Sequence, residues 1–100
     1  MENKFEWDEH KNGSNIEKHG INFCDAIKVF DGPSLSMKDN RVDYGESRTI
    51  VIGLLRDRMV VVVYAIREDR IRIIPARKAN EREQKKFQNR LAASGPYEGR

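Results

Sequence analysis

The sequence predicts one α+β domain: two helices near the N-terminus, an antiparallel-type sheet of four to five strands, and a C-terminal helix. Helical periodicity is confined to the two ends of the chain, and short segments rich in valine and isoleucine lie between them. A chain of 100 residues has room for one core, so we expect a single domain over 1–93 and a flexible tail at 94–100. We expect the helices to pack on one face of the sheet.

The N-terminal third predicts a short strand and then two helices. Residues 5–7 alternate between apolar and charged, as a strand does. Asp8 is placed to cap a helix over 9–18, which Gly20 ends. Asn22 is placed to cap a second helix whose apolar residues recur at helical spacing. Those apolar residues are Phe23, Ala26, Ile27 and Phe30.

The middle of the chain predicts an antiparallel meander, and the end predicts a third helix. The expected strands are 35–38, 48–55, 59–66 and 70–76. Turn-forming residues separate them at 56–58 and 68–69. Asn80 with Glu83 three residues later matches a capping box, and Phe87 then lies on the inner side of the helix.

Composition excludes several classes of protein. The longest uncharged apolar run, 59–66, is far shorter than a membrane span, and the first residues lack the basic start and apolar stretch of a secretory signal. One cysteine cannot form an intramolecular disulfide, and with only two histidines the chain lacks the ligands of a zinc cluster unless carboxylates or a second subunit contribute. We therefore expect a cytoplasmic protein that uses no metal or cofactor and no membrane.

Positive charge is concentrated in the last third. Residues 1–64 hold 9 basic and 11 acidic side chains, whereas residues 65–90 hold 9 basic and 4 acidic ones. The basic residues of the second stretch are Arg67, Arg70, Arg72, Arg77, Lys78, Arg82, Lys85, Lys86 and Arg90. Arginine suits phosphate because its planar fork presents paired donors, so a polyanion is a reasonable partner. A solvated helix face at the chain end is the plainer interpretation.

Strand geometry groups several of these arginines. Side chains two apart on a strand share a face, so Arg70 and Arg72 lie together while Ile71 faces the core. A tight turn brings Arg67 opposite them, and Arg77 leaves the strand just before the last helix. Exposed arginines that alternate with isoleucine are also ordinary for a sheet with one solvated face.

Lys18 and His19 form a second group, in the last turn of the first predicted helix. A protonated histidine at that place is stabilised by the helix dipole, so capping is its commoner role and proton transfer the rarer one. Lys11, Asn15 and Lys18 recur at helical spacing and share a polar face, which solvation alone explains.

Many residues match a known pattern in order and spacing. The first half carries Phe5-Glu6-Trp7-Asp8-Glu9, Lys11, Asn15, Lys18-His19-Gly20-Ile21, Phe23, Ala26, Val29-Phe30-Asp31 and Pro33. The second half carries Glu46, Arg48, Ile52-Gly53, Val62-Val63-Tyr64, Arg67, Ile71-Arg72-Ile73-Ile74-Pro75-Ala76-Arg77-Lys78-Ala79, Glu83 and Phe87. This set resembles the BrnT toxins over nearly the whole chain. The family usually has Ser where this chain has Pro75, Tyr in place of Phe87, and often a polar or acidic residue at Ile66.

The resemblance implies a ribonuclease toxin of a type II toxin-antitoxin pair, with a RelE-like fold, that inhibits translation. It also implies neutralisation through direct binding by a BrnA-type antitoxin. In that family the antitoxin carries the DNA-binding domain, so the toxin meets DNA only through its partner. A homodimer or a toxin-antitoxin heterotetramer would be consistent with such a pair.

RNA cleavage without a metal uses the 2′-hydroxyl of the substrate as nucleophile, so the protein supplies a base, an acid and cations for the phosphate. We expect Arg67, Arg72 and Arg77 to grip the phosphates. In this hypothesis His19, helped by Lys18, transfers the proton. The further basic residues that we expect to contact RNA are Lys11, Arg70, Lys78 and Arg82.

Two other functions fit the same residues. A basic domain that binds RNA or protein without chemistry would lack an acidic base, as Ile66 before Arg67 suggests. A toxin whose nuclease has decayed would use the basic sheet face to dock an acidic or amphipathic partner segment. Cleavage products distinguish the enzyme from the binding module, and toxicity on expression without the partner distinguishes it from the decayed toxin.

Overall fold

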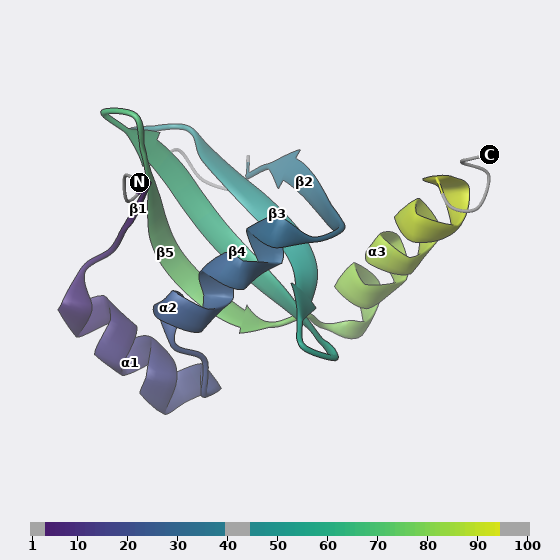
Figure 1. Cartoon of the computed structure of the whole chain (residues 1–100), viewed down its shortest axis with the longest axis horizontal. Coiled ribbons are helices and arrows are strands. Elements are labelled where there is room, and N and C mark those ends of the chain that lie inside the picture. The colour runs from purple at the N-terminus through teal and green to yellow at the C-terminus, as the bar shows by residue number, and fades with distance from the viewer. Residues whose placement is uncertain (1–3, 40–44, 95–100) are drawn as a thin grey trace.

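The computed structural model describes residues 4–39 and 45–94 and confirms the α+β class, with helices on either side of a five-stranded sheet (Figure 1). The helices are α1 (Glu9–His19), α2 (Phe23–Ala26), the 3-10 helix η1 (Ile27–Asp31) and α3 (Glu81–Ser94). The strands are β1 (Phe5–Glu6), β2 (Ser34–Lys38), β3 (Arg48–Leu55), β4 (Arg58–Arg67) and β5 (Arg70–Lys78). Apart from Ser94, the predicted tail lies outside the described residues.

The sheet is mixed, in the order β1-β5-β4-β3-β2. Strands β2 to β5 pair antiparallel, as the meander predicts, whereas β1 pairs parallel with β5. An extra residue in β5 interrupts its pairing with β4 between Ile73 and Ala76. Pro75 falls in this irregular stretch, which tolerates a residue that has no backbone N–H.

The helix ends follow the predicted caps. Asp8 accepts hydrogen bonds from the backbone N–H groups of the first turn of α1, and Gly20 ends that helix in the left-handed conformation with φ of 71°. Asn22 caps α2. Asn80 and Glu83 exchange two 2.8 Å hydrogen bonds at the start of α3, which confirms the capping box.

The sheet is covered on both faces, so the expectation that all helices share one face is wrong. The first face carries α2 and η1, whose core residues include Phe23 and Val29. The second face carries α3, whose fully buried Phe87 packs in a core with Ile52 and Val61. The reason lies in the unbroken buried run 60–63, because a strand with consecutive buried residues needs cover on both sides.

Helix α1 lies against β5 and presents one buried side to it. Its buried residues are Asn12 and Asn15, whereas Lys11 and Lys18 are exposed. Solvation alone therefore does not explain the polar face predicted for α1, since the side-chain amide of Asn15, in the middle of that face, is buried between α1 and β5. None of the helices in the described ranges is long and apolar enough to cross a bilayer.

Candidate functional site

The part of the second sheet face that α3 leaves uncovered carries a row of charged side chains across four strands. Arg48 of β3 pairs with Ala65 of β4, and Ala65 pairs with Arg72 of β5. Glu6 of β1 pairs with Arg72 at the edge. Directly paired residues point to the same side of a sheet, and Arg67 shares that side because it lies two residues beyond Ala65.

Carboxylates hold each of these guanidinium groups. Arg67 donates from Nε to Oε1 of Glu46 and from Nη2 to Oε2, both at 3.0 Å. Arg48 donates from Nη2 to Oε2 of the same Glu46 at 3.5 Å. Arg72 donates from Nη1 to Oε2 of Glu6 at 3.3 Å. We call Arg48, Arg67 and Arg72, with Glu6 and Glu46, the arginine cluster.

The electrostatics of the cluster keep it ionised. The hydrogen bond from Arg67 is the largest cause that holds the pKa of Glu46 below its ordinary 4.5, with the charges of Arg67 and Arg48 adding to it. The same bond raises the pKa of Arg67. The Arg67 side chain is 46% exposed, so a phosphate has access to it and can compete with Glu46 for its donors.

Arg77 lies on the same sheet face but is occupied by α3. Its Nη1 and Nη2 donate to the two carboxylate oxygens of Glu83 at 2.8 and 2.7 Å, and Nη1 also reaches the carbonyl oxygen of Lys78. Glu83 is at the same time the acid of the capping box. Arg77 therefore fixes the start of α3 to the end of β5.

The structure does not bring Lys18 and His19 to the arginine cluster. Both are exposed in the last turn of α1, after the point where Asn15 contacts Ala76 of β5. Arg72 lies four residues back along β5 from that contact, about 13 Å at the rise of a strand, and on the second face. Their predicted role in proton transfer remains a prediction.

The other basic residues predicted to bind RNA are spread over three elements. Arg70 pairs with Arg67 where the β4–β5 hairpin closes, beside the arginine cluster. Lys11 is exposed on α1, Lys78 is exposed at the end of β5, and Arg82 is exposed on α3. Of these four, the structure places only Arg70 next to the predicted phosphate-binding arginines.

Ile66 lies on the face opposite Arg67, because adjacent residues of a strand alternate, and it is 60% exposed. A side chain at position 66 therefore does not face the arginine cluster. The acidic groups that do face it, Glu6 and Glu46, have no site role in the sequence prediction. Glu6 and Arg72 are separated by 66 positions in the sequence, and Glu46 and Arg67 by 21, so no local pattern indicates either pair.

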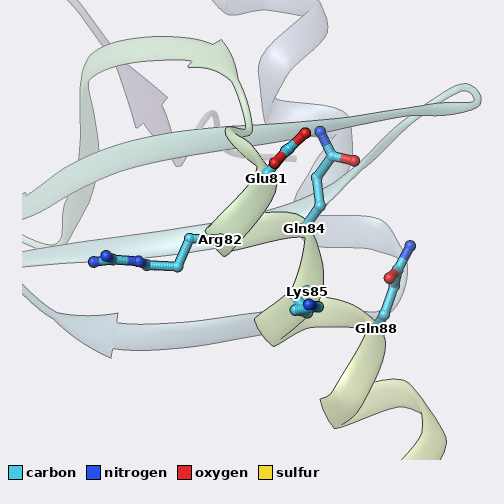
Figure 2. Close-up of a pocket in the computed structure, with 5 residues that line it drawn as sticks. All are labelled: Glu81, Arg82, Gln84, Lys85 and Gln88. Atoms are coloured by element: carbon cyan, nitrogen blue, oxygen red, sulfur yellow. The ribbon is translucent and has the colours of Figure 1, made fainter.

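A hollow of about 510 Å³ lies along α3 instead of over the arginine cluster. In Figure 2 the side chains of Glu81 and Gln84 point to one side of α3, whereas Arg82 reaches out to another. Its described lining is polar and comes from α3 alone, so it has no apolar wall that would hold a small ligand.

The chain matches a known protein family. A family model described as the ribonuclease toxin, BrnT, of a type II toxin-antitoxin system matches residues 7–83. The match spans α1, the whole sheet except β1, and the start of α3. No curated protein matches the chain.

Proposed function

Since the chain belongs to the BrnT family of ribonuclease toxins from type II toxin-antitoxin systems, we propose that it is an endoribonuclease that cleaves RNA without a metal ion and so inhibits translation. The observation that carries this proposal is the arginine cluster, where Arg67 and Arg72 lie on an open sheet face with carboxylates beside them. We assign the scissile phosphate to these two arginines.

The chemistry needs charge stabilisation more than a cofactor. Attack by the 2′-hydroxyl of RNA builds negative charge on the phosphorus-bound oxygens, and preorganised guanidinium groups stabilise that charge. Glu46 orients Arg67 and Arg48 before the substrate arrives.

Proton transfer is assigned to His19, helped by Lys18, as a separate part of the proposal. A proton-transfer group must lie within hydrogen-bond reach of the reacting atoms, so this assignment requires α1 to move from its contact with β5 toward Arg72. Arg77 contributes to the site indirectly, by holding the start of α3 in place, since its guanidinium donors are bonded to Glu83.

A type II toxin has an antitoxin protein as partner. We propose that this partner is of the BrnA type and binds the toxin directly, and that DNA is reached only through it. We further propose a cytoplasmic location and assembly as a homodimer or a toxin-antitoxin heterotetramer.

The deciding experiment is RNA cleavage by the purified, antitoxin-free chain in EDTA. A DNA strand of the same sequence and the Arg72→Ala variant serve as controls. Arg58→Ala is the matched variant, because Arg58 is an exposed arginine at the far end of β4. We expect RNA to be cut and DNA spared, with activity lost in Arg72→Ala and retained in Arg58→Ala.

A binding module without chemistry is the alternative, and one observation favours it: both assigned arginines are already neutralised by carboxylates. In that case RNA binding weakens steeply with salt and no cleavage product forms. A second test measures the growth of cells that express the chain without its antitoxin. A nuclease arrests growth by cutting RNA, whereas a binding module or a decayed nuclease does not.

A further inference from the structure

A second hollow, a cleft of about 330 Å³, lies between α3 and the outer part of the sheet on the second face. Its floor is formed by Met37 of β2 with Ile50 and Ile52 of β3. Met37 and Ile50 are paired across the two strands, so they form one continuous apolar surface. Ile52 is fully buried, while the other two are only partly covered.

The floor stays accessible because of the direction of α3. The helix starts at the end of β5 and runs outward from the sheet (Figure 1). Phe87 closes the core over Ile52, but Met37 and Ile50 lie at its margin. The result is an apolar surface beside a helix and open at the side, a shape that receives a flat group.

The rim of the cleft is mainly cationic, because Lys38, Arg82 and Lys86 line it together with the two carboxylates of Asp39 and Glu83. Arg82 and Lys86 are four residues apart, so they lie on the same side of α3, and both line the cleft. Figure 2 shows Arg82 extended away from Gln84 and Gln88. The nearest acid of α3, Glu83, is neutralised by Arg77. An apolar floor under a basic rim complements a nucleobase joined to a phosphate.

The cleft is adjacent to the arginine cluster. Ile50 lies two residues from Arg48 on the same side of β3, about 7 Å along the strand. A single RNA strand whose phosphate binds at Arg67 and Arg72 therefore has its neighbouring nucleotides within reach of the cleft. In a double helix the edges of each base are hydrogen-bonded and its faces are stacked on neighbouring bases. Only an unpaired nucleotide can therefore enter the cleft.

We propose that this cleft binds one nucleotide of single-stranded RNA next to the bond that is cut. The base lies on Met37 and Ile50, and its phosphate contacts Arg82 and Lys86. The cleft volume is at the lower end of the roughly 300 to 1,000 Å³ of small-ligand sites, which suits one nucleotide. The position of this nucleotide next to the cleaved bond rests on the proposed ribonuclease function. The binding of the nucleotide in the cleft does not.

The test uses a mixed-sequence 2′-O-methyl RNA hexamer, which lacks the attacking hydroxyl and cannot be cut. Methyl NMR of the full chain follows Met37 and Ile50 during titration. We expect both methyl signals to shift. In the double variant Arg82→Ala with Lys86→Ala, we expect the salt slope of binding to fall by about 0.7, since both side chains contact the same phosphate and each neutralised phosphate on a single strand contributes about 0.7.

Lys85→Ala is the control, because it removes one positive charge from the residue next to Lys86, on a side chain that does not line the cleft. We expect its binding and both methyl shifts to equal those of the unchanged chain. If the hexamer binds and neither methyl moves, the nucleotide site is wrong. The same holds if purified antitoxin shifts these methyls while RNA does not, since the cleft then belongs to the antitoxin.

The outcomes separate the two proposals. Methyl shifts without any cleavage of natural RNA leave the nucleotide site standing and remove the ribonuclease. Cleavage without methyl shifts leaves the ribonuclease standing and removes the nucleotide site.

Discussion

Asn15 and Ala76 are joined by two hydrogen bonds that imitate a strand pair. The Asn15 side chain donates from Nδ2 to the Ala76 carbonyl at 2.8 Å and accepts from the Ala76 N–H at 3.1 Å. The same Nδ2 also donates to the carbonyl of Ile21 at 2.9 Å. Strand β1 is only two residues long and covers β5 at Ile71 and Arg72, so a side chain completes the edge that β1 does not reach.

Asn15→Ala tests this edge. The substitution leaves the buried N–H and C=O of Ala76 without their partners, so we expect the free energy of unfolding to fall by about 2 kcal/mol. Urea denaturation measures it. Ser14→Ala, an exposed neighbour on α1, should change the value by less than about 0.5 kcal/mol. Equal midpoints for the two variants would contradict the role of the amide.

Arg77 and Glu83 should behave as a pair that holds α3. Arg77→Ala, Glu83→Ala and the double variant form a double-mutant cycle, from which we expect a coupling energy of about 1 kcal/mol. Glu83→Ala should cost more than Glu81→Ala, because Glu81 lies in the same first turn but forms no part of the capping box. Additive effects would show that the contact does not stabilise the fold.

The titration of Glu46 should report its contact with Arg67. The pKa of Glu46 lies below 4.5, so the ion pair contributes stability above that pH and loses it as the pH falls through the lowered value. Arg67→Ala should raise the pKa of Glu46 toward its ordinary value. Carboxyl ¹³C NMR measures the shift, with Arg58→Ala as control. An unchanged titration in Arg67→Ala contradicts the cause given for the shift.

His19→Ala tests the proton-transfer role against the geometry. If His19 moves the proton, kcat falls by about 100-fold while RNA affinity is unchanged, because proton transfer acts on the chemical step and not on substrate binding. His10→Ala, which removes the other histidine of α1, is the matched control and should keep full activity. Turnover that survives in His19→Ala removes this residue from the mechanism.

The β4–β5 hairpin offers a stabilising change. Glu68 and Asp69 both have positive φ, at 50° and 68°, the conformation of a type I′ turn that asparagine and glycine adopt most easily. Glu68→Asn with Asp69→Gly should raise the free energy of unfolding by about 1 kcal/mol. Thermal denaturation checks this. Asp69→Ala retains the Cβ, so it should give no gain, and a gain there would point to another cause.

Local structure was predictable from sequence because its determinants are local. Asp8, Asn22 and the Asn80–Glu83 box each act on N–H groups two or three residues away, so their spacing predicts the helix starts. The position of α3 was predicted wrongly, since the face that Phe87 covers depends on how the strands assemble.

Of the candidate site, only the positively charged residues could be predicted from the sequence. Alternation along β5 indicates that Arg70 and Arg72 share a face, and the tight turn places Arg67 opposite them. The partners Glu6 and Glu46 come from distant parts of the chain, and Asn15 reads as a surface residue although its amide is buried. Such contacts follow from tertiary packing and leave no periodic signal.

The parallel pairing of β1 with β5 also sets the order of assembly. Glu6 and Arg72 are 66 positions apart, so this contact closes only after the first 72 of the 100 residues have been synthesised and β5 has docked on β4. Contacts between distant residues form late because their loop closure is costly until the intervening chain has folded. A nascent chain still short of residue 72 therefore carries no arginine cluster, and the site forms only after β1 has paired with β5.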